Sequence, residues 1–309
     1  MTEFITGWPD HPLSDTWLTI GNFDGVHLGH QALFKGLRVR AEEQNGQTQV
    51  LTFWPHPRVV LGQVSEGFLL TTRQEKEQQL QVAGVDMVLT LPFDENMAEI
   101  SAKDFLEKLV ACVRPAGMLV GPEFRLGKGR QGDFTFIQNF CTSKNIACET
   151  FPPFHLDGQV VSSNLIRASL IEGHIEKAAD LLGRPFSLEG VIQQGKQIGR
   201  KLGFPTANLI PEPLQILPRF GVYATRVLLE DQVLMGVTNV GVRPTFESDA
   251  EPNVETLILD FDDKIYHEMI RVEFLSFLRP ERRFERVEDL IAQVEDDETQ
   301  TRRILQYGP

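Results

Sequence analysis

The first half of the chain alternates between two hydrophobic patterns. Short apolar runs have the length of buried strands, at 17–20, 49–54, 85–91, 117–121 and 146–151. Amphipathic segments lie between them, and the clearest, 27–43, carries Leu33, Phe34, Leu37 and Ala41 at helical spacing. Strands that alternate with helices form right-handed β-α-β units around a parallel sheet. The pattern therefore predicts a doubly wound, Rossmann-like α/β domain.

Polar residues mark two of the expected helix starts. Thr72 precedes Glu75 by three residues, which is the spacing of a capping box, so a helix is expected to about Ala83. Ser101 is expected to cap a helix that runs through Cys112. A further helix is expected at 134–144, which completes the alternation.

The pattern changes near residue 186. Short β-rich runs separated by turn residues occur at 187–193, 222–229, 233–240, 254–261 and 265–274. Asp262-Asp263-Lys264 is expected to form a hairpin turn between the last two runs. One acidic helix, 287–305, follows, so the second half is expected to be a small antiparallel β-barrel with a terminal helix, or a small sandwich with that helix. The predicted domains are 1–183 and 184–309.

Charge and cysteine content narrow the expected setting. The 309 residues include 30 basic and 43 acidic side chains, a net charge of −13, which disfavours nucleic acid or an anionic membrane as a partner. The three cysteines form no C-x-x-C pair, so no zinc or redox motif is expected, and their number fits a reducing cytoplasm. No signal peptide is expected from the first ten residues, and no apolar run approaches the roughly 20 residues that span a bilayer. A cytoplasmic protein is expected.

The first candidate site is the string Gly21-Asn22-Phe23-Asp24-Gly25-Val26-His27-Leu28-Gly29-His30. It lies between a predicted strand and a predicted helix, where glycines and free N–H groups suit a phosphate ligand. His27 and His30 are three residues apart, so both face one side of the first turn and can stabilise charge on a phosphoryl group. The alternative is a glycine turn with two surface histidines.

Two later strings could add phosphate contacts in the same half. The segment 121–130 is basic and glycine-rich and contains Arg125. Ser162 and Ser163 stand at an expected helix start, with Arg167 four residues after Ser163, a spacing that can grip phosphates from one side. The alternative is that a serine simply caps the helix and Arg167 is solvated.

The second half contains a basic, glycine-rich segment suited to wrapping phosphates, with Gly195, Gly199, Arg200 and Gly203. Pro205 favours an extended chain, in which Thr206 and Asn208 point to the same face. A hydroxyl and an amide oxygen make a sparse site of the kind Mg²⁺ accepts when phosphates and water supply the other ligands. The alternative is a turn and a strand with one polar face.

Two further residues of the second half have an ambiguous role. Glu255 interrupts an apolar strand, where a carboxylate could take a proton from an alcohol or simply face outward. Arg243 follows the string Asn239-Val-Gly-Val and is equally open. The sequence does not separate these readings.

The motifs and their order resemble the bacterial bifunctional riboflavin kinase/FAD synthetase family. The first string has the H-x-G-H signature of nucleotidyltransferases, and L-G-F-P-T-A-N at 202–208 is similar to the riboflavin kinase motif. The resemblance implies that the second half phosphorylates riboflavin with ATP and that the first half transfers AMP from ATP to FMN, releasing pyrophosphate. The implied small molecules are ATP with Mg²⁺, riboflavin, FMN and FAD.

The resemblance also implies roles for individual residues. His27 and His30 would stabilise the ATP phosphates and the departing pyrophosphate, and Glu255 would be the kinase base. Thr206 and Asn208 would bind Mg²⁺–nucleotide. The expected nucleotide and flavin contacts are Gly21, Asn22, Phe23, Asp24, Gly25, Arg125, Ser162, Ser163, Arg167, Gly195, Gly199, Arg200, Gly203, Pro205 and Arg243.

Four positions depart from the family pattern: Trp54, Leu126, Asn164 and Thr256. Three of them lie in the first half, so a single live site, the kinase, is an alternative to two. A flavin-binding protein without turnover is a third hypothesis, against which the five intact residues His27, His30, Thr206, Asn208 and Glu255 argue.

Overall fold

A computed structural model describes residues 2–13, 16–64, 66–194, 199, 202–242 and 252–307. The chain forms two compact units. Unit 1 comprises Met1–Ser65 and Thr71–Ser163, and unit 2 comprises Glu66–Leu70 and Asn164–Pro309. As compact bodies the units therefore divide between Ser163 and Asn164, while the functional boundary between 183 and 184 stays a prediction.

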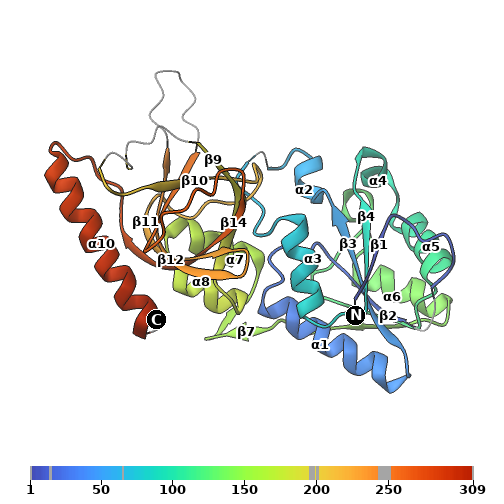
Figure 1. The fold of residues 1–309 in the computed structure, drawn as a ribbon. Coiled ribbons are helices and arrows are strands. Elements are labelled where there is room, and N and C mark those ends of the chain that lie inside the picture. Colours follow the sequence, from blue (N-terminus) through green and yellow to red (C-terminus); the bar gives the residue numbers. More distant parts are fainter. Residues whose placement is uncertain are drawn as a thin grey trace. The chain divides into compact units, whose positions relative to one another are not determined.

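Unit 1 is built on a parallel sheet of six strands in the order β1-β4-β3-β2-β5-β6 (Figure 1). The strands are β1 (Glu3–Thr6), β2 (Thr16–Ile20), β3 (Gln47–Trp54), β4 (Met87–Pro92), β5 (Gly117–Val120) and β6 (Ala147–Thr150). The doubly wound α/β prediction is confirmed. The sequence pattern did not indicate β1, a four-residue edge strand whose side chains are mostly exposed.

Four longer helices cross over between these strands. They are α1 (Leu28–Glu43), α3 (Arg73–Val82), α5 (Ala102–Val113) and α6 (Phe134–Ser143). Thr72 and Ser101 cap α3 and α5 as predicted, because their side chains accept hydrogen bonds from the N–H groups of Glu75 and Asp104. Shorter elements complete the unit: α2 (Pro57–Val60), α4 (Glu95–Glu99), η1 (Lys128–Arg130) and the pair β7 (His155–Leu156) and β8 (Gln159–Val160).

Side-chain alternation along the strands gives the sheet two apolar faces. Neighbouring residues such as Val50 and Leu51 enter different core clusters, because successive side chains of a strand point to opposite faces. Val50 joins the cluster that contains residues of α1 and α3, whereas Leu51 joins the one that contains residues of α5 and α6. Figure 1 shows these helix pairs on opposite sides of the sheet.

The strand order of the sheet reverses between β2 and β5. The chain runs from β2 through β3 towards β4, then crosses back so that β5 lies on the other side of β2. Ligands of open α/β sheets bind at such a reversal, at the carboxyl ends of the strands. The segments that follow β2 and β5 begin at Gly21 and Gly121, so the first candidate site emerges at this position.

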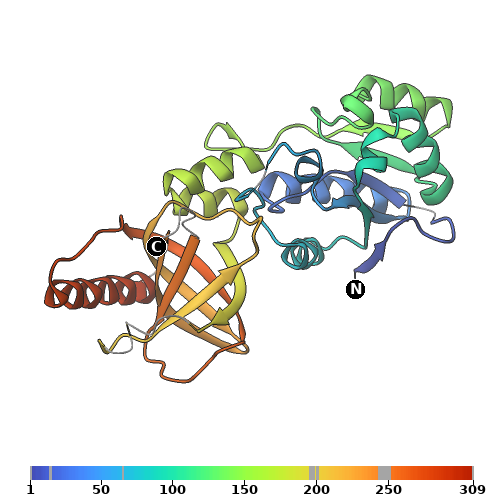
Figure 2. The same ribbon diagram turned by 90° about the horizontal axis from the view of Figure 1, so that it is seen from above.

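Unit 2 is a closed antiparallel barrel in the order β10-β13-β12-β11-β14-β9 (Figure 2). Its strands are β9 (Phe186–Gln193), β10 (Thr206–Pro211), β11 (Gly221–Leu229), β12 (Gln232–Val242), β13 (Pro252–Ile258) and β14 (Met269–Arg279). The helices of this unit are α7 (Ser163–Glu172), which begins one residue inside unit 1, α8 (Ile175–Leu182) and α10 (Val287–Tyr307). The predicted barrel with a terminal helix is confirmed.

The predicted hairpin at Asp262-Asp263-Lys264 is wrong. β13 pairs with β10 and β12, whereas β14 pairs with β11 and β9, so the two strands that flank this segment are not neighbours. Turn residues between two strand patterns do not specify which strands pair. The barrel closure decided the pairing here.

Two arginine–aspartate pairs attach α10 to the rest of unit 2. Asp297 is 2% exposed and accepts hydrogen bonds from Nε and Nη2 of Arg279, at 3.0 and 2.7 Å. Asp260, which is 67% exposed, accepts from both terminal nitrogens of Arg302. The two pairs have similar geometry but differ in their exposure to water.

We expect Asp297→Ala to destabilise unit 2 by about 3–5 kcal/mol, because it leaves the Arg279 guanidinium without its partner in a buried position. Asp260→Ala is the matched control, and its effect should be far smaller because water solvates the exposed partners. Hydrogen exchange of the barrel amides measures unit 2 separately from unit 1. Equal losses of stability in the two variants would contradict the expected difference between the buried pair and the exposed pair.

Candidate active sites

The loop after β2 is held in a strained conformation. Phe23 and Val26 have positive φ values of 49° and 40°, which non-glycine residues rarely adopt, and Gly25 has a φ of 84°. Such strain persists only where surrounding contacts stabilise it, and it concentrates at functional sites. The surrounding contacts therefore fix one strained backbone conformation of the Gly21–Gly25 loop, which is predicted to bind nucleotide and flavin.

Several contacts within unit 1 hold this loop. The carbonyl oxygen of Asn22 accepts from the Thr52 hydroxyl at 3.1 Å, and the carbonyl oxygen of Asp24 accepts from the Ser163 hydroxyl at 2.9 Å. The Asp24 carboxylate is buried and accepts from the N–H of Thr71 at 3.3 Å. The Ser163 hydroxyl thus contacts the loop, while its contact with ATP stays a prediction, and the Asp24 carboxylate connects the loop to Thr71.

The two histidines stack at the start of α1. His27 is the N-cap residue, and its Nδ1 accepts the N–H of His30 at 3.3 Å. The ring centroids are 3.6 Å apart and the ring planes differ by 17°. The structure thus places both imidazoles at the positive end of the helix dipole, where a phosphate is favoured.

His30 is held in its neutral form. Burial, followed by the neighbouring His27 and Lys76, lowers the pKa of His30 well below its usual value. The Phe23 ring contacts it edge-on, with centroids 5.1 Å apart. Within the described part of the chain, the Nδ1 atom of His30 is buried and has no hydrogen-bond partner. A neutral imidazole can donate one hydrogen bond to a phosphate oxygen.

The other predicted residues of this site differ in their surroundings. Arg125 is exposed in the segment after β5. Arg167 belongs to unit 2 and is buried, which contradicts the solvated alternative. Its Nε donates to the Phe68 carbonyl at 2.7 Å, and its Nη1 donates to Asn164 at 3.0 Å. A contact of Arg125, Arg167 or Ser162 with ATP stays a prediction.

In unit 2 a cavity of about 770 Å³ is lined by residues of the five barrel strands β10–β14, of the segment after β14, and of α10. This volume is in the range of small-molecule sites. Thr206, Asn208 and Glu255 all line it. Asn208 of β10 stands opposite Glu255 of β13, which in turn stands opposite Asn239 of β12. Three polar side chains therefore lie side by side across three strands.

The structure resolves the orientation of Glu255. Its neighbour Thr256 is fully buried, and the hydroxyls of Thr256 and Thr238 are 2.9 Å apart within a row that continues to Thr225. Because side chains alternate along a strand, Glu255 points away from that row, into the cavity that Val294 of α10 also lines. The carboxylate neither fills the barrel interior nor faces open solvent.

A tight turn leads into β10. The N–H groups of Leu202 and Phe204 both donate to the Gly199 carbonyl, at 3.0 and 2.9 Å. A Cβ on Gly199 would lie 2.4 Å from the Phe204 carbonyl oxygen, so the turn requires glycine there. Gly203 has a φ of 91°, which also favours glycine. Gly195, Arg200 and Arg243 lie outside the described residues.

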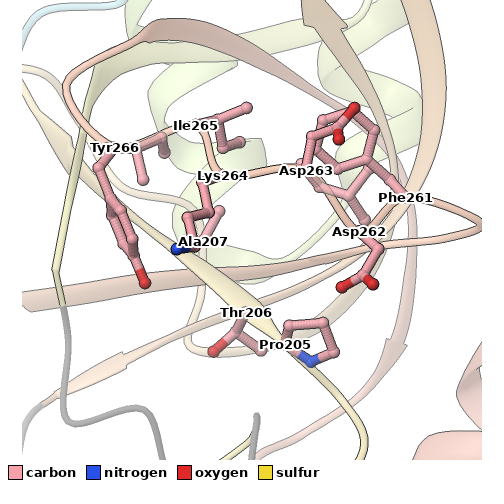
Figure 3. A pocket seen from close by; sticks show the side chains of 11 residues that line it. Pro205, Thr206, Ala207, Phe261, Asp262, Asp263, Lys264, Ile265 and Tyr266 are labelled. Carbon is pink, nitrogen blue, oxygen red and sulfur yellow. The ribbon is translucent and has the colours of Figure 1, made fainter.

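A second, smaller hollow of about 70 Å³ adjoins the first residues of β10 (Figure 3). Figure 3 shows Pro205 and Thr206 on one side of it and Lys264 and Tyr266 on the other. Thr206 lines this hollow and the large cavity alike. The Thr206 side chain, at the start of β10, therefore borders both the small hollow and the large cavity.

The described residues offer few side-chain ligands for a metal ion. Among the residues that the structure describes, no group of three His, Cys, Asp or Glu side chains could hold a metal ion. Thr206 and Asn208 nevertheless offer two hard oxygen donors to the cavity, next to the Glu255 carboxylate. Such a set fits Mg²⁺ that arrives with a nucleotide and keeps phosphate and water ligands.

Comparison with known proteins identifies both halves. The FAD synthetase family model matches residues 10–165, and the riboflavin kinase model matches residues 182–305. Bifunctional riboflavin kinase/FMN adenylyltransferases from Listeria monocytogenes and Escherichia coli are 34% and 37% identical, over 94% and 93% of this chain and 95% and 92% of theirs. The chain belongs to this family. The Haemophilus influenzae member is 38% identical over 91% of both chains.

A solved structure has a similar fold over nearly the whole chain. A protein from Streptococcus pneumoniae, named a macrolide-efflux protein, matches with a TM-score of 0.87 and 27% identity, over 97% of this chain and 98% of that one. Its name describes that protein. In the described part of the present chain, no helix is long and apolar enough to cross a membrane.

The departures from the family pattern have structural explanations in three cases. Thr256 takes part in the hydroxyl row inside the barrel, and Asn164 orients the Arg167 guanidinium. Leu126 is buried in the core cluster that contains α5 and α6. None of these three replaces a residue of the histidine pair or of the β10–β13 row.

Sequence reasoning missed three residues beside the two sites. Two of them, Asn239 and Glu281, line the cavity of unit 2. Asn239 stands opposite Glu255, and its side-chain nitrogen donates to Glu281 at 3.0 Å. The third, Lys76, donates a hydrogen bond to the Asn22 carbonyl of the Gly21–Gly25 loop. The alternation of strand residues could have indicated that Asn239 is a polar residue on one face of its strand. Only the strand register places it beside Glu255. Nothing in the sequence distinguishes Lys76 from the other lysines.

Proposed function

We propose that this chain converts riboflavin to FMN in unit 2 and FMN to FAD in unit 1, using ATP in both reactions. The observation that carries the proposal is the Glu255 carboxylate opposite Asn208 in a cavity of about 770 Å³. The stacked histidines at the reversal of the parallel sheet support the second activity. Family membership supports the assignment of flavins and ATP as the substrates.

In the kinase reaction, the 5′-hydroxyl of riboflavin attacks the γ-phosphorus of ATP. An oxygen–phosphorus bond forms, the bond to the β–γ bridging oxygen breaks, and the hydroxyl proton passes to the Glu255 carboxylate. Thr206 lines the same cavity as Glu255, so a nucleotide phosphate held at Thr206 would lie near the carboxylate that takes the proton. Positioning is the main contribution of the protein to such a transfer.

In the adenylylation reaction, a phosphate oxygen of FMN attacks the α-phosphorus of ATP, and the bond to the α–β bridging oxygen breaks to release pyrophosphate. Negative charge grows on the leaving pyrophosphate. His27 and His30 would donate hydrogen bonds to it from the start of α1, where the helix dipole favours an anion. Because His30 is neutral, it stabilises this charge as a hydrogen-bond donor.

The Mg²⁺ site is part of this proposal. When bound, the ion would neutralise charge on the phosphate oxygens. Thr206 and Asn208 would hold it from one face of β10. The proposed location is the cytoplasm, supported by the three free cysteines. ATP, riboflavin and FMN are the proposed partners.

We expect Thr206→Val to raise the Mg²⁺ concentration needed for half-maximal kinase activity by about 10-fold or more, because the variant keeps the shape but loses an oxygen donor. Thr206→Ser retains the hydroxyl and should behave as the parent protein does. FMN adenylylation in unit 1 is the internal control. An unchanged Mg²⁺ dependence in Thr206→Val would remove this residue from the metal site.

The proposal is tested by incubating the protein with riboflavin, ATP and Mg²⁺, in parallel with a reaction started from FMN. Chromatography should show FMN rising first and FAD following. FMN without FAD from either reaction would leave only the kinase active. Flavin binding without any product would favour the non-catalytic alternative.

A further inference from the structure

Lys76 is a buried lysine that the reaction scheme above does not use. It lies near the start of α3 and is 4% exposed. Its Nζ donates to the Asn22 carbonyl at 3.3 Å, the Thr52 hydroxyl at 3.1 Å and the Phe53 carbonyl at 3.2 Å. An ammonium group has three donors, and here all three have acceptors.

These contacts join the end of β3 to the strained loop. Asn22 comes directly before Phe23, whose φ is positive, and its carbonyl oxygen accepts from both Thr52 and Lys76. With that oxygen bound on the side of Lys76, the negative end of the peptide dipole faces the ammonium. A carbonyl oxygen turned towards a phosphate would instead repel it.

Placing this charge in the protein interior has a cost. Lysine is among the residues least often buried, because its ammonium loses hydration. Burial lowers the pKa of Lys76 to about 8, an effect that Asp24 and Glu77 oppose and Arg73 reinforces. The Trp54 ring lies 5.4 Å from the ammonium, and Lys76 in turn contributes to the lowered pKa of His30.

We infer that Lys76 is a positioning residue for FMN adenylylation, and that its ammonium holds the Asn22 carbonyl and with it the conformation of the Gly21–Gly25 loop. This inference rests on the proposed adenylyl transfer at the two histidines. Lys76 itself does not touch the substrate. It acts through the Gly21–Gly25 loop, whose Asn22 carbonyl accepts its hydrogen bond.

The test compares Lys76→Met and Lys76→Arg in the full chain. Lys76→Met keeps a similar length without charge, and its kcat for FAD formation from FMN should fall by up to about 100-fold, because the reacting groups lose their alignment. FMN formation from riboflavin should stay at the parental rate. Lys103→Met, at a lysine that is 68% exposed, is the matched control and should leave both activities unchanged.

The pH profile separates a charge effect from a packing effect. Lys76 carries its charge below about pH 8 and loses it above, so the parental adenylylation rate should fall as the pH rises through that value. Lys76→Arg, whose guanidinium stays charged, should keep part of the activity and lack this fall. In Lys76→Met the pKa of His30, followed by NMR, should rise because one cation that lowers it has been removed.

Parental adenylylation in Lys76→Met, or an unchanged alkaline fall in Lys76→Arg, would overturn the inference. If Lys76→Met unfolds, the Lys76→Arg profile still decides. A parent protein that forms no FAD from FMN would instead contradict the proposed function itself, so the two failures are distinguishable.

Discussion

Glu255→Gln is expected to lower FMN formation from riboflavin by about 10²- to 10⁴-fold, the usual contribution of a general base. The amide nearly matches the carboxylate in size and stands at the same register position opposite Asn208 and Asn239, but it cannot take the hydroxyl proton. FAD formation from supplied FMN should continue, because the histidines lie in the other unit. Both rates are measured by chromatography of the flavins.

Glu288→Gln provides the control for this variant, since Glu288 is a 72% exposed carboxylate of α10. It should leave the kinase rate unchanged. An undiminished rate in Glu255→Gln would show that the base lies elsewhere or that none is needed. Glu281, another carboxylate that lines the cavity, would then be the next residue to replace.

His30→Ala is expected to lower FAD formation from FMN by about 10²- to 10³-fold, which is typical for the loss of one donor to a developing negative charge. The substitution also removes the edge-on contact with Phe23, so thermal unfolding has to be followed alongside the rates. FMN formation from riboflavin should be spared because Glu255 and its cavity belong to unit 2.

His11→Ala is the matched control in the same unit, because His11 is exposed. It should leave both activities at the parental level. Equal loss of both activities in His30→Ala, with the fold intact, would contradict the separation of the two sites. FAD formation at the parental rate would leave His27 as the principal donor.

The two outcomes together also decide between one live site and two. Trp54, Leu126 and Asn164 are the departures that motivated a silent first site. In the structure, Leu126 fills the core and Asn164 orients Arg167, so neither disturbs the histidine pair. The Trp54 ring contacts the Lys76 ammonium, which donates a hydrogen bond to the Asn22 carbonyl of the Gly21–Gly25 loop. Trp54 is therefore the departure most closely connected to that site.

The sequence by itself determined the fold class of each half and the position of the motifs along the chain. Periodicity carries this information because burial on one face of an element repeats every two residues in a strand and every 3.6 in a helix. Val50 and Leu51 illustrate it, since adjacent apolar residues enter different cores. Local chemistry likewise determined the caps at Thr72 and Ser101 and the extended chain after Pro205.

Only the tertiary structure decided which distant residues face one another. The row Asn208, Glu255 and Asn239 exists because β13 pairs with β10 and β12, and the mistaken hairpin at Asp262-Asp263-Lys264 shows that local turn signals do not specify such pairing. The direction of Glu255 depended on the same register. Lys76 was placed beneath Asn22 by the packing of α3, 54 residues away in the chain. Pairing and burial of this kind depend on the energy of the whole fold, to which the local pattern contributes only one part.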